Sequence, residues 1–290
     1  PMVSAARMTP HAFTTPDAAG PVGIFDSGVG GLSVWREIAR QCPAEHTIYV
    51  ADQAHVPYGP RDEVELRRFC EGITRFLLAS GCKAIVVACN TASAAALKHL
   101  RECFPHVATL GMEPAVKPAA QITRSRVVGV MATPATFAGK LFRATAGRHA
   151  SGVKLVTQVC DGLAEQVERG DTDSSATEVM LRRFVEPMLA AGADTIVLAC
   201  THYPFALDAI QRIAGTGVTV IDPAPAIARH LGDVLGSRQL RNGSGSRATH
   251  RFLTTGDPAS LRAAVHRWCG IDGEIGALRW TEDDSELVFA

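Results

Sequence analysis

The sequence predicts an α/β fold of two pseudo-symmetric domains, with mainly parallel sheets flanked by helices and the functional site in the cleft between them. Three apolar segments predict it, because each recurs later in the chain in the same order. Residues 84–91 read Ala-Ile-Val-Val-Ala-Cys-Asn-Thr and residues 195–202 read Thr-Ile-Val-Leu-Ala-Cys-Thr-His, at an offset of 111 that Gly81 and Gly192 share. Residues 22–25 recur as 128–131, and the segment ending Glu113-Pro-Ala recurs as Asp222-Pro-Ala, at offsets of 106 and 109. Matches at nearly constant offset indicate a duplicated α/β unit.

The longest repeat has the pattern of a strand, a turn and a helix. Short apolar runs rich in β-branched residues, bounded by turn residues, are typical of strands buried on both faces of a parallel sheet. Cys89 and Cys200 end these runs, so we expect both at the carboxyl ends of strands, where open α/β sheets bind ligands. Two such units facing each other would bring both thiols to one cleft.

The first unit begins with a strand at 22–25 and a glycine-rich turn, Asp26-Ser-Gly-Val-Gly-Gly31. A helix with Leu32, Trp35, Ile38 and Ala39 on one face follows, and this is the context in which backbone N–H groups meet a ligand anion. The elements expected next are a strand at 47–51 ending at Asp52, a Pro-Tyr-Gly turn at 57–59, a helix at 63–79, a helix from about 93 to 103 and a strand from about 107 to 110.

The second unit begins with a strand at 128–131, and Ala132-Thr-Pro-Ala-Thr136 replaces the glycine-rich turn. We expect a helix at 177–190, a helix start around Pro204, a loop at 236–248, a strand at 251–254 and a helix at 258–268. The predicted division is a flexible leader at 1–20, a first domain at 21–114 plus about 223–290, and a second domain at 115–222.

The composition excludes several classes of protein. There are 29 basic and 29 acidic residues with no basic stripe, which argues against a nucleic-acid partner. No apolar stretch approaches the length of a bilayer span, and residues 1–20 lack the apolar core of a signal peptide, so we expect no membrane contact and a cytoplasmic location. The eight cysteines form no close Cys-x-x-Cys pairs, which favours a reducing compartment. Five of them are expected to be buried structural thiols: Cys70, Cys82, Cys103, Cys160 and Cys269.

Two thiols on opposite walls of a cleft can act as an acid–base pair. A thiolate can remove the α-proton of an amino acid from one face while a thiol returns a proton to the other, which inverts the carbon without a metal or cofactor, provided that fixed donors meet the developing charge. Helix N-termini or charged neighbours lower a thiol pKa from its usual value of about 8.5. Asp26 is placed to steer one thiol and His202, two residues after Cys200, the other.

Two other classes of site use the same residues. A nucleotide- or flavin-binding protein would use the turn at 26–31, although that turn lacks the lysine of a P-loop. A zinc protein would use Cys89, Cys200 and His202, since three such ligands plus water suffice for zinc. Asp26 could also simply cap the turn before its helix.

Four motifs together resemble the glutamate racemase family, cofactor-independent enzymes that supply D-glutamate for bacterial peptidoglycan. They are Asp-Ser-Gly-x-Gly-Gly at 26–31, Pro-Tyr-Gly at 57–59, Cys-Asn-Thr-Ala at 89–92 and Cys-Thr-His-Tyr-Pro at 200–204, in a resemblance that spans about residues 21–270. It implies two pseudo-symmetric α/β domains, L- and D-glutamate as substrates, no metal or cofactor, and a homodimer. An aspartate or hydantoin racemase would use the same two-thiol mechanism. It would differ in the contacts that bind the distal part of the substrate.

The resemblance also implies a role for each matching residue. Cys89 would act on the α-proton of D-glutamate and Cys200 on that of L-glutamate, with Asp26 and His202 as their respective helpers. A further helper would be Glu168, with Glu165 as an alternative because the surrounding segment departs from the family pattern. The substrate would be bound by Asp26, Ser27, Tyr58, Gly59, Asn90, Thr91, Thr201 and His202, with hydroxyls of Thr133 and Thr136 added from the second unit.

Overall fold

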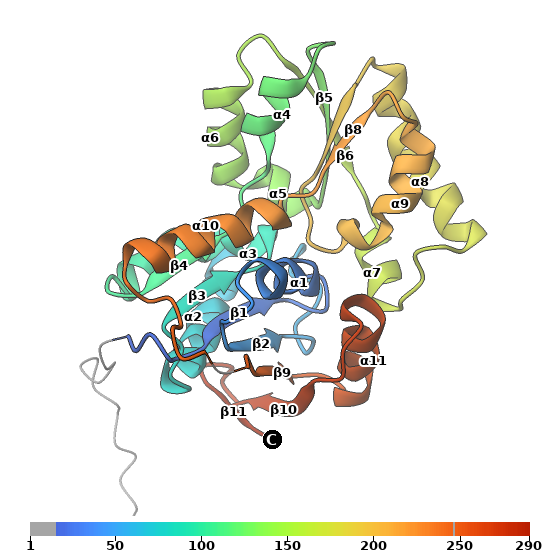
Figure 1. Ribbon diagram of the computed structural model, residues 1–290. Coiled ribbons are helices and arrows are strands. Elements are labelled where there is room, and N and C mark those ends of the chain that lie inside the picture. The colour runs from blue at the N-terminus through green and yellow to red at the C-terminus, as the bar shows by residue number, and fades with distance from the viewer. Residues whose placement is uncertain (1–15, 246) are drawn as a thin grey trace, which may run out of the picture.

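Two separate sheets form the framework of the chain in the computed structural model, which describes residues 16–245 and 247–290 (Figure 1). The larger sheet has seven strands in the order β11-β10-β9-β2-β1-β3-β4, and only β11 runs antiparallel to its neighbour. Its strands are β1 (Val22–Asp26), β2 (Thr47–Ala51), β3 (Ala84–Val87), β4 (Ala108–Gly111), β9 (His250–Thr254), β10 (Glu274–Trp280) and β11 (Leu287–Phe289).

The smaller sheet repeats the centre of the larger one. Its order is β6-β5-β7-β8, all parallel, built from β5 (Val127–Ala132), β6 (Lys154–Val159), β7 (Thr195–Leu198) and β8 (Thr219–Ile221). The order β2-β1-β3-β4 is therefore duplicated, as the repeated segments predict, with β1 matching β5 and β3 matching β7. The strand order reverses between β1 and β3 in the larger sheet and between β5 and β7 in the smaller one, and ligands of open α/β sheets bind at such points.

Helices cover both faces of the larger sheet, which explains why every residue of β1 and β2 is buried. One apolar core joins the sheet to α1 (Leu32–Gln41), α10 (Ala224–Ser237) and α11 (Pro258–Cys269). The core on the other face includes α2 (Glu63–Ala79) and α3 (Asn90–Cys103). Successive residues of β1 supply the two cores in turn, since Ile24 belongs to the first and Phe25 to the second.

The smaller sheet is also enclosed by two cores. On one face lie α8 (Ser175–Ala190), α9 (Leu207–Ala214) and the 3₁₀ turn Tyr203–Ala206. The opposite face carries α4 (Val116–Ile122), α5 (Pro134–Ala138) and α6 (Lys140–His149). The short helix α7 (Leu163–Glu168) follows β6 and packs beside the 3₁₀ turn. In Figure 1 the smaller sheet lies in the upper part of the molecule and the larger sheet in the lower part.

Several element boundaries differ from the predicted ones for local reasons. Helix α3 begins at Asn90 rather than near residue 93, because Cys89 caps it and accepts a hydrogen bond from the Ala92 N–H. The predicted loop at 236–248 is wrong at its start, since α10 continues to Ser237. The sequence analysis did not predict the strands β6, β10 and β11 or the helices α4, α5, α6, α7 and α10. Strand β6 exposes at least part of every residue and so lacks the apolar run of a buried strand.

The end of the predicted flexible leader, residues 16–20, contacts the larger sheet just before β1. The buried ammonium of Lys83 donates to the Ala18 carbonyl oxygen and pairs with the Glu45 carboxylate at 2.5 Å. Residues 1–15 of the predicted leader lie outside the described residues.

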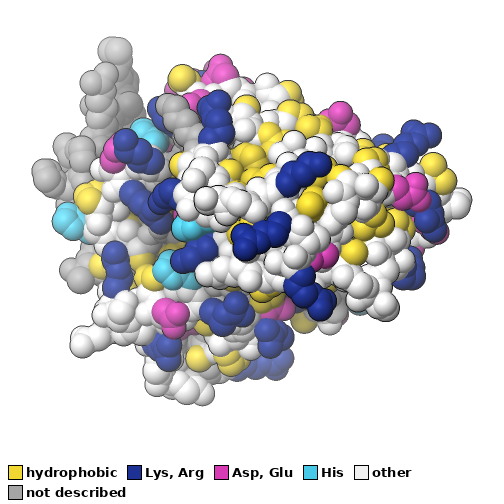
Figure 2. Space-filling model, turned by 90° about the horizontal axis from the view of Figure 1, so that it is seen from above, with side chains coloured by type: hydrophobic (Ala, Val, Ile, Leu, Met, Phe, Trp, Pro, Cys, Tyr) yellow, Lys and Arg dark blue, Asp and Glu magenta, His cyan; other side chains and the backbone are white. Residues whose placement is uncertain are grey.

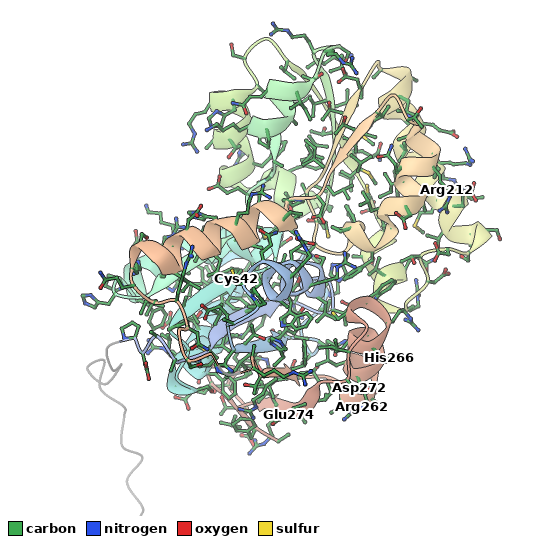
Figure 3. The ribbon with its side chains drawn as sticks, in the orientation of Figure 1. Cys42, Arg212, Arg262, His266, Asp272 and Glu274 are labelled. Carbon is green, nitrogen blue, oxygen red and sulfur yellow. The ribbon has the colours of Figure 1, made fainter. Side chains whose placement is uncertain are left out.

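The structure corrects one prediction about the cysteines. Cys103 is exposed, not buried, because it lies in the last turn of α3, and Cys269 is only partly buried. Cys42 lies where α1 ends against α10 (Figure 3), with its thiol 3.9 Å from the Ala228 carbonyl oxygen.

One face of the molecule shows how its charged side chains are distributed (Figure 2). On the face in Figure 2, Lys and Arg side chains are spread among acidic and apolar ones rather than aligned in a stripe. Among the helices of the described residues, none is long and apolar enough to cross a membrane.

Candidate active site

The carboxyl ends of β1, β3 and β7 face one small cavity between the two sheets. Cys89 and Cys200 both line it, so the two predicted thiols share one enclosed space. The turns that follow these strands supply most of the wall: Ser27, Asn90, Thr91, Thr201 and His202, together with Tyr58, Gly59, Thr133 and Thr136. The cavity therefore brings together residues that are more than 100 positions apart in the chain.

Cys200 belongs to a hydrogen-bonded chain of three side chains. The His202 Nδ1 lies 3.8 Å from the Cys200 sulfur, and the His202 Nε2 lies 2.7 Å from Glu168 Oε1. Because the carboxylate only accepts, the Nε2 donates and the Nδ1 faces the thiol. Burial lowers the pKa of His202, but its bonds to Cys200 and Glu168 outweigh this and raise it well above the ordinary value.

Glu168 is held in its charged form at the end of α7. Its Oε1 also accepts the Val29 N–H at 2.7 Å, and its Oε2 lies 3.4 Å from the Gln53 amide nitrogen. Burial alone would raise the pKa of Glu168; the hydrogen bond and charge of His202 and the Val29 N–H lower it overall. A carboxylate beside an imidazole favours the imidazolium form. The carboxylate therefore equips His202 to hold a proton beside the Cys200 sulfur.

Asp26 joins the two halves of the site from the end of β1. Its Oδ2 accepts the Thr201 hydroxyl at 2.7 Å, and its Oδ1 accepts the Ser27 hydroxyl at 2.9 Å. Asp26 is fully buried, and burial raises its pKa above the ordinary value even though the charge of His202 and the two hydroxyls oppose the shift. A buried carboxyl group with a raised pKa can exchange a proton with a neighbouring acid or base.

Cys89 lies in a different electrostatic setting from Cys200. Burial raises the pKa of the Cys89 thiol well above its ordinary value, and the Asp26 charge raises it further. The Ala92 N–H at the start of α3 acts in the opposite direction, 3.4 Å from the sulfur. The predicted help from the helix N-terminus is present but smaller than the effect of burial. Cys89 is thus a thiol, the form that donates a proton.

The buried amide of Asn90 is available to bind a polar ligand. Its side chain is only 4% exposed and lines the cavity, yet neither its oxygen nor its nitrogen has a hydrogen-bond partner among the described residues. Leaving a buried amide unpaired costs roughly 1–3 kcal/mol. Beside it, the hydroxyls of Thr91, Thr133 and Thr136 form a chain across the cleft at 3.2 and 3.1 Å.

The glycine-rich turn provides room for the helper side chains. A Cβ at Gly28 would overlap the Glu168 carboxylate, and a Cβ at Gly30 would overlap the His202 ring. The Val29 N–H, which a phosphate would need in a nucleotide site, already donates to Glu168. The turn therefore fits this acid–base site and not the nucleotide-binding alternative.

Tyr58 is positioned by a network that the sequence analysis missed. Its hydroxyl donates to the buried Asp52 at 2.7 Å, so it is not free to bind a ligand as a donor. Asp52 also accepts from Trp280 Nε1 at 2.7 Å and from the Thr255 hydroxyl at 2.9 Å. The available signal was the position of Asp52 at the end of β2, at the same sheet edge as Asp26. Asp52 thus links the C-terminal strands to the cavity wall.

The zinc and Glu165 alternatives find no support in the geometry. Cys89, Cys200 and His202 do not form a cluster of ligand atoms within 4.8 Å of one another in the described part of the chain. Glu165 is exposed, whereas Glu168 contacts His202 directly.

Two thiols, one beside an imidazole whose pKa is raised and one whose own pKa is raised by burial, define a site for acid–base chemistry at carbon. Comparison with known proteins agrees: the chain belongs to the Asp/Glu/Hydantoin racemase family, whose sequence pattern matches residues 22–231. It is 50% identical to a glutamate racemase of Stutzerimonas stutzeri over 84% of this chain and 92% of that one.

Solved structures give the same result. A glutamate racemase isoform from Bacillus anthracis has a TM-score of 0.82 and 32% identity, covering 89% of this chain and 97% of the other. A glutamate racemase from Francisella tularensis, solved with D-glutamate, has a TM-score of 0.79 and 26% identity, covering 90% and 97%.

Proposed function

We propose that the chain is a glutamate racemase that interconverts L- and D-glutamate by a two-thiol acid–base mechanism and so supplies D-glutamate for peptidoglycan. The observation that carries the proposal is the shared cavity of Cys89 and Cys200, with their different charge environments. Relatives named glutamate racemases, one of them solved with D-glutamate, support the choice of substrate.

In the direction from L to D, His202 takes the proton of Cys200, and Glu168 stabilises the resulting imidazolium. The Cys200 thiolate then removes the α-proton of L-glutamate, and the electron pair passes into the substrate's α-carboxylate. The Cys89 thiol donates its proton to the opposite face of the same carbon, which gives D-glutamate. Unpaired donors such as the Asn90 amide stabilise the charge that develops on the carboxylate.

In the direction from D to L the roles exchange. Asp26 helps to remove the proton of Cys89, and Cys200 donates to the opposite face. L- and D-glutamate have equal free energies, so kcat/KM must be the same for both directions whatever the asymmetry of the two thiols. The asymmetry therefore has to be sought in pH profiles, isotope exchange and the separate values of kcat and KM.

The remaining features of the proposal follow from the family and the fold. Domain boundaries near 114 and 223 are supported by the strand order, which places β9, β10 and β11 in the first sheet. The cytoplasmic location is proposed from the eight cysteines without close pairs, and the homodimer from the family resemblance; light scattering would test the homodimer by finding twice the mass of one chain.

A circular-dichroism time course tests the activity. Purified chain, without cofactor and in the presence of a chelator, is expected to abolish the optical signal of L-glutamate at a rate proportional to enzyme and to act far less on L-aspartate. Cys89→Ala and Cys200→Ala are expected to be inactive, while Cys103→Ser, an exposed cysteine outside the cavity, keeps the native rate. Native racemisation by Cys89→Ala would overturn the role of that thiol.

A further inference from the structure

A second group of metal-binding side chains lies away from the cavity, on the outer side of α2 and α3. Glu71 of α2 and His99 and Cys103 of α3 each offer a ligand atom, and these atoms lie within 4.8 Å of one another. Among the described residues this is the one group of three or more such side chains that close together. None of its members belongs to the racemase machinery.

The geometry converges on one nitrogen. The His99 Nε2 lies 2.8 Å from Glu71 Oε2 and 3.5 Å from the Cys103 sulfur, while its Nδ1 lies farther from that sulfur, at 3.8 Å. Tetrahedral zinc, with bonds of about 2.0 Å to nitrogen and 2.3 Å to sulfur, places such ligands roughly 3.5 Å apart. The nitrogen and the sulfur are at the separation of two zinc ligands, but the sulfur lies nearly as close to Nδ1 and so beside the ring; a rotation of the exposed Cys103 side chain and a small shift of the carboxylate bring the three ligand atoms around one ion.

The backbone holds the three side chains in this arrangement. His99 and Cys103 are four residues apart on α3 and so share one face of the helix. Helices α2 and α3 are fixed to each other through a common apolar core and through Arg67, whose Nε donates to the Ala95 carbonyl oxygen. Cys103 lies in the last turn of α3, where the helix dipole favours a cation.

The surroundings leave an open position for water. Glu71 and His99 are about a quarter exposed, at 26% and 28%, and Cys103 is exposed, so solvent reaches the ligand atoms. Arg75 pairs with the other carboxylate oxygen of Glu71, Oε1, at 2.6 Å, which orients Oε2 towards His99. Such outer contacts orient first-shell ligands in known metal sites.

We propose that Glu71, His99 and Cys103 form a surface site for a zinc-type divalent cation, with water as the fourth ligand. One thiolate, one imidazole and one carboxylate suit zinc or cobalt and not magnesium or calcium, which prefer oxygen ligands alone. On binding, the Cys103 thiol releases its proton to solvent and its sulfur forms the metal bond. The proton that His99 Nε2 donates to Glu71 in the metal-free protein leaves to solvent, the neutral ring then carries its remaining proton on Nδ1, and Nε2 coordinates the ion. The ion then ties α2 to α3, whose first residue follows Cys89.

Cobalt titration of the full-length protein tests the site, since a cobalt–thiolate bond gives a charge-transfer band in the near ultraviolet. The band is expected in the native chain and in the Cys89→Ala/Cys200→Ala double variant. It should be lost in Cys103→Ser and kept in Cys269→Ser, a partly buried cysteine elsewhere.

Competition with a chromophoric chelator measures zinc affinity in the same variants. His99→Gln and Glu71→Gln are expected to weaken binding by at least about 10–100-fold, the effect seen even for outer-shell partners of metal ligands. A band that survives Cys103→Ser but disappears in the double variant would place the metal at the racemase cavity and overturn the proposal. Absence of any band in the folded native chain would also overturn it. Neither result would bear on racemisation measured with a chelator present.

Discussion

Replacing Glu168 by Gln tests how the His202–Cys200 pair is charged. The substitution keeps the shape of the side chain and an acceptor oxygen for His202, but removes the charge that stabilises the imidazolium. Hydrogen bonds to charged groups contribute about 1.5–3 kcal/mol against about 1 kcal/mol for neutral ones, so a loss of about 1.3 kcal/mol, or roughly eightfold in kcat/KM, is expected. The fall must be equal for L- and D-glutamate, since the enantiomers are equally stable.

The pH profile gives the sign of the same effect. Glu168 raises the pKa of His202, so its removal lowers that pKa. If the active form carries the proton on His202, activity is lost as the pH rises through this pKa, and the alkaline limb of kcat/KM moves to lower pH in Glu168→Gln. Glu165→Gln removes the same charge from an exposed position in the same helix and should leave rate and profile unchanged.

The assay is the circular-dichroism rate with each enantiomer between pH 6 and 10, on variants shown to be folded by their far-ultraviolet spectra. A Glu168→Gln enzyme with a rate within about twofold of native and an unmoved alkaline limb would refute the charged-pair reasoning. An equal loss in Glu165→Gln would refute it as well, because the effect would then be long-range charge and not contact with His202.

Three further substitutions test separate parts of the structure. Asn90→Leu removes an unpaired buried amide, so thermal unfolding should show equal or higher stability while KM for glutamate rises at least about tenfold; an unchanged KM would exclude Asn90 from binding. Gly30→Ala places a methyl group against the His202 ring, so activity should fall about 100-fold or more in a folded protein, and native activity would show that the ring can move freely. Lys83→Met leaves the Glu45 carboxylate buried without its partner and should cost about 3–5 kcal/mol in denaturant unfolding, whereas a loss below about 1 kcal/mol would contradict the buried pair.

The sequence was informative wherever a local pattern carried the signal. The repeated strand–cysteine segments predicted the matched strands β3 and β7 and the shared cavity of their cysteines, because parallel strands present their carboxyl ends at one sheet edge. The strand at 47–51 and the helix at 63–79 have the predicted limits, and Asp62 caps that helix by accepting from the Glu65 N–H.

Contacts between segments far apart in the chain could not be predicted, because no local sequence pattern indicates them. Glu168 meets Val29 across 139 positions, and Trp280 meets Asp52 across 228. The helix that carries Glu168 has only six residues, which is too short to show a repeating helical pattern of apolar residues. Only the family resemblance therefore indicated the role of Glu168. The glycines at 28 and 30 looked like a phosphate turn; their steric purpose emerges only once Glu168 and His202 are folded against them.

Deuterium exchange in single-thiol variants tests the opposed thiols most directly. In heavy water, Cys89→Ala retains Cys200, so deuterium should enter the α-position of L-glutamate without inversion while D-glutamate stays unlabelled. Cys200→Ala should give the mirror-image result, and the native chain should label both enantiomers as it interconverts them. Labelling of D-glutamate by Cys89→Ala, or continued inversion by either variant, would contradict a mechanism in which each sulfur serves one face of the carbon.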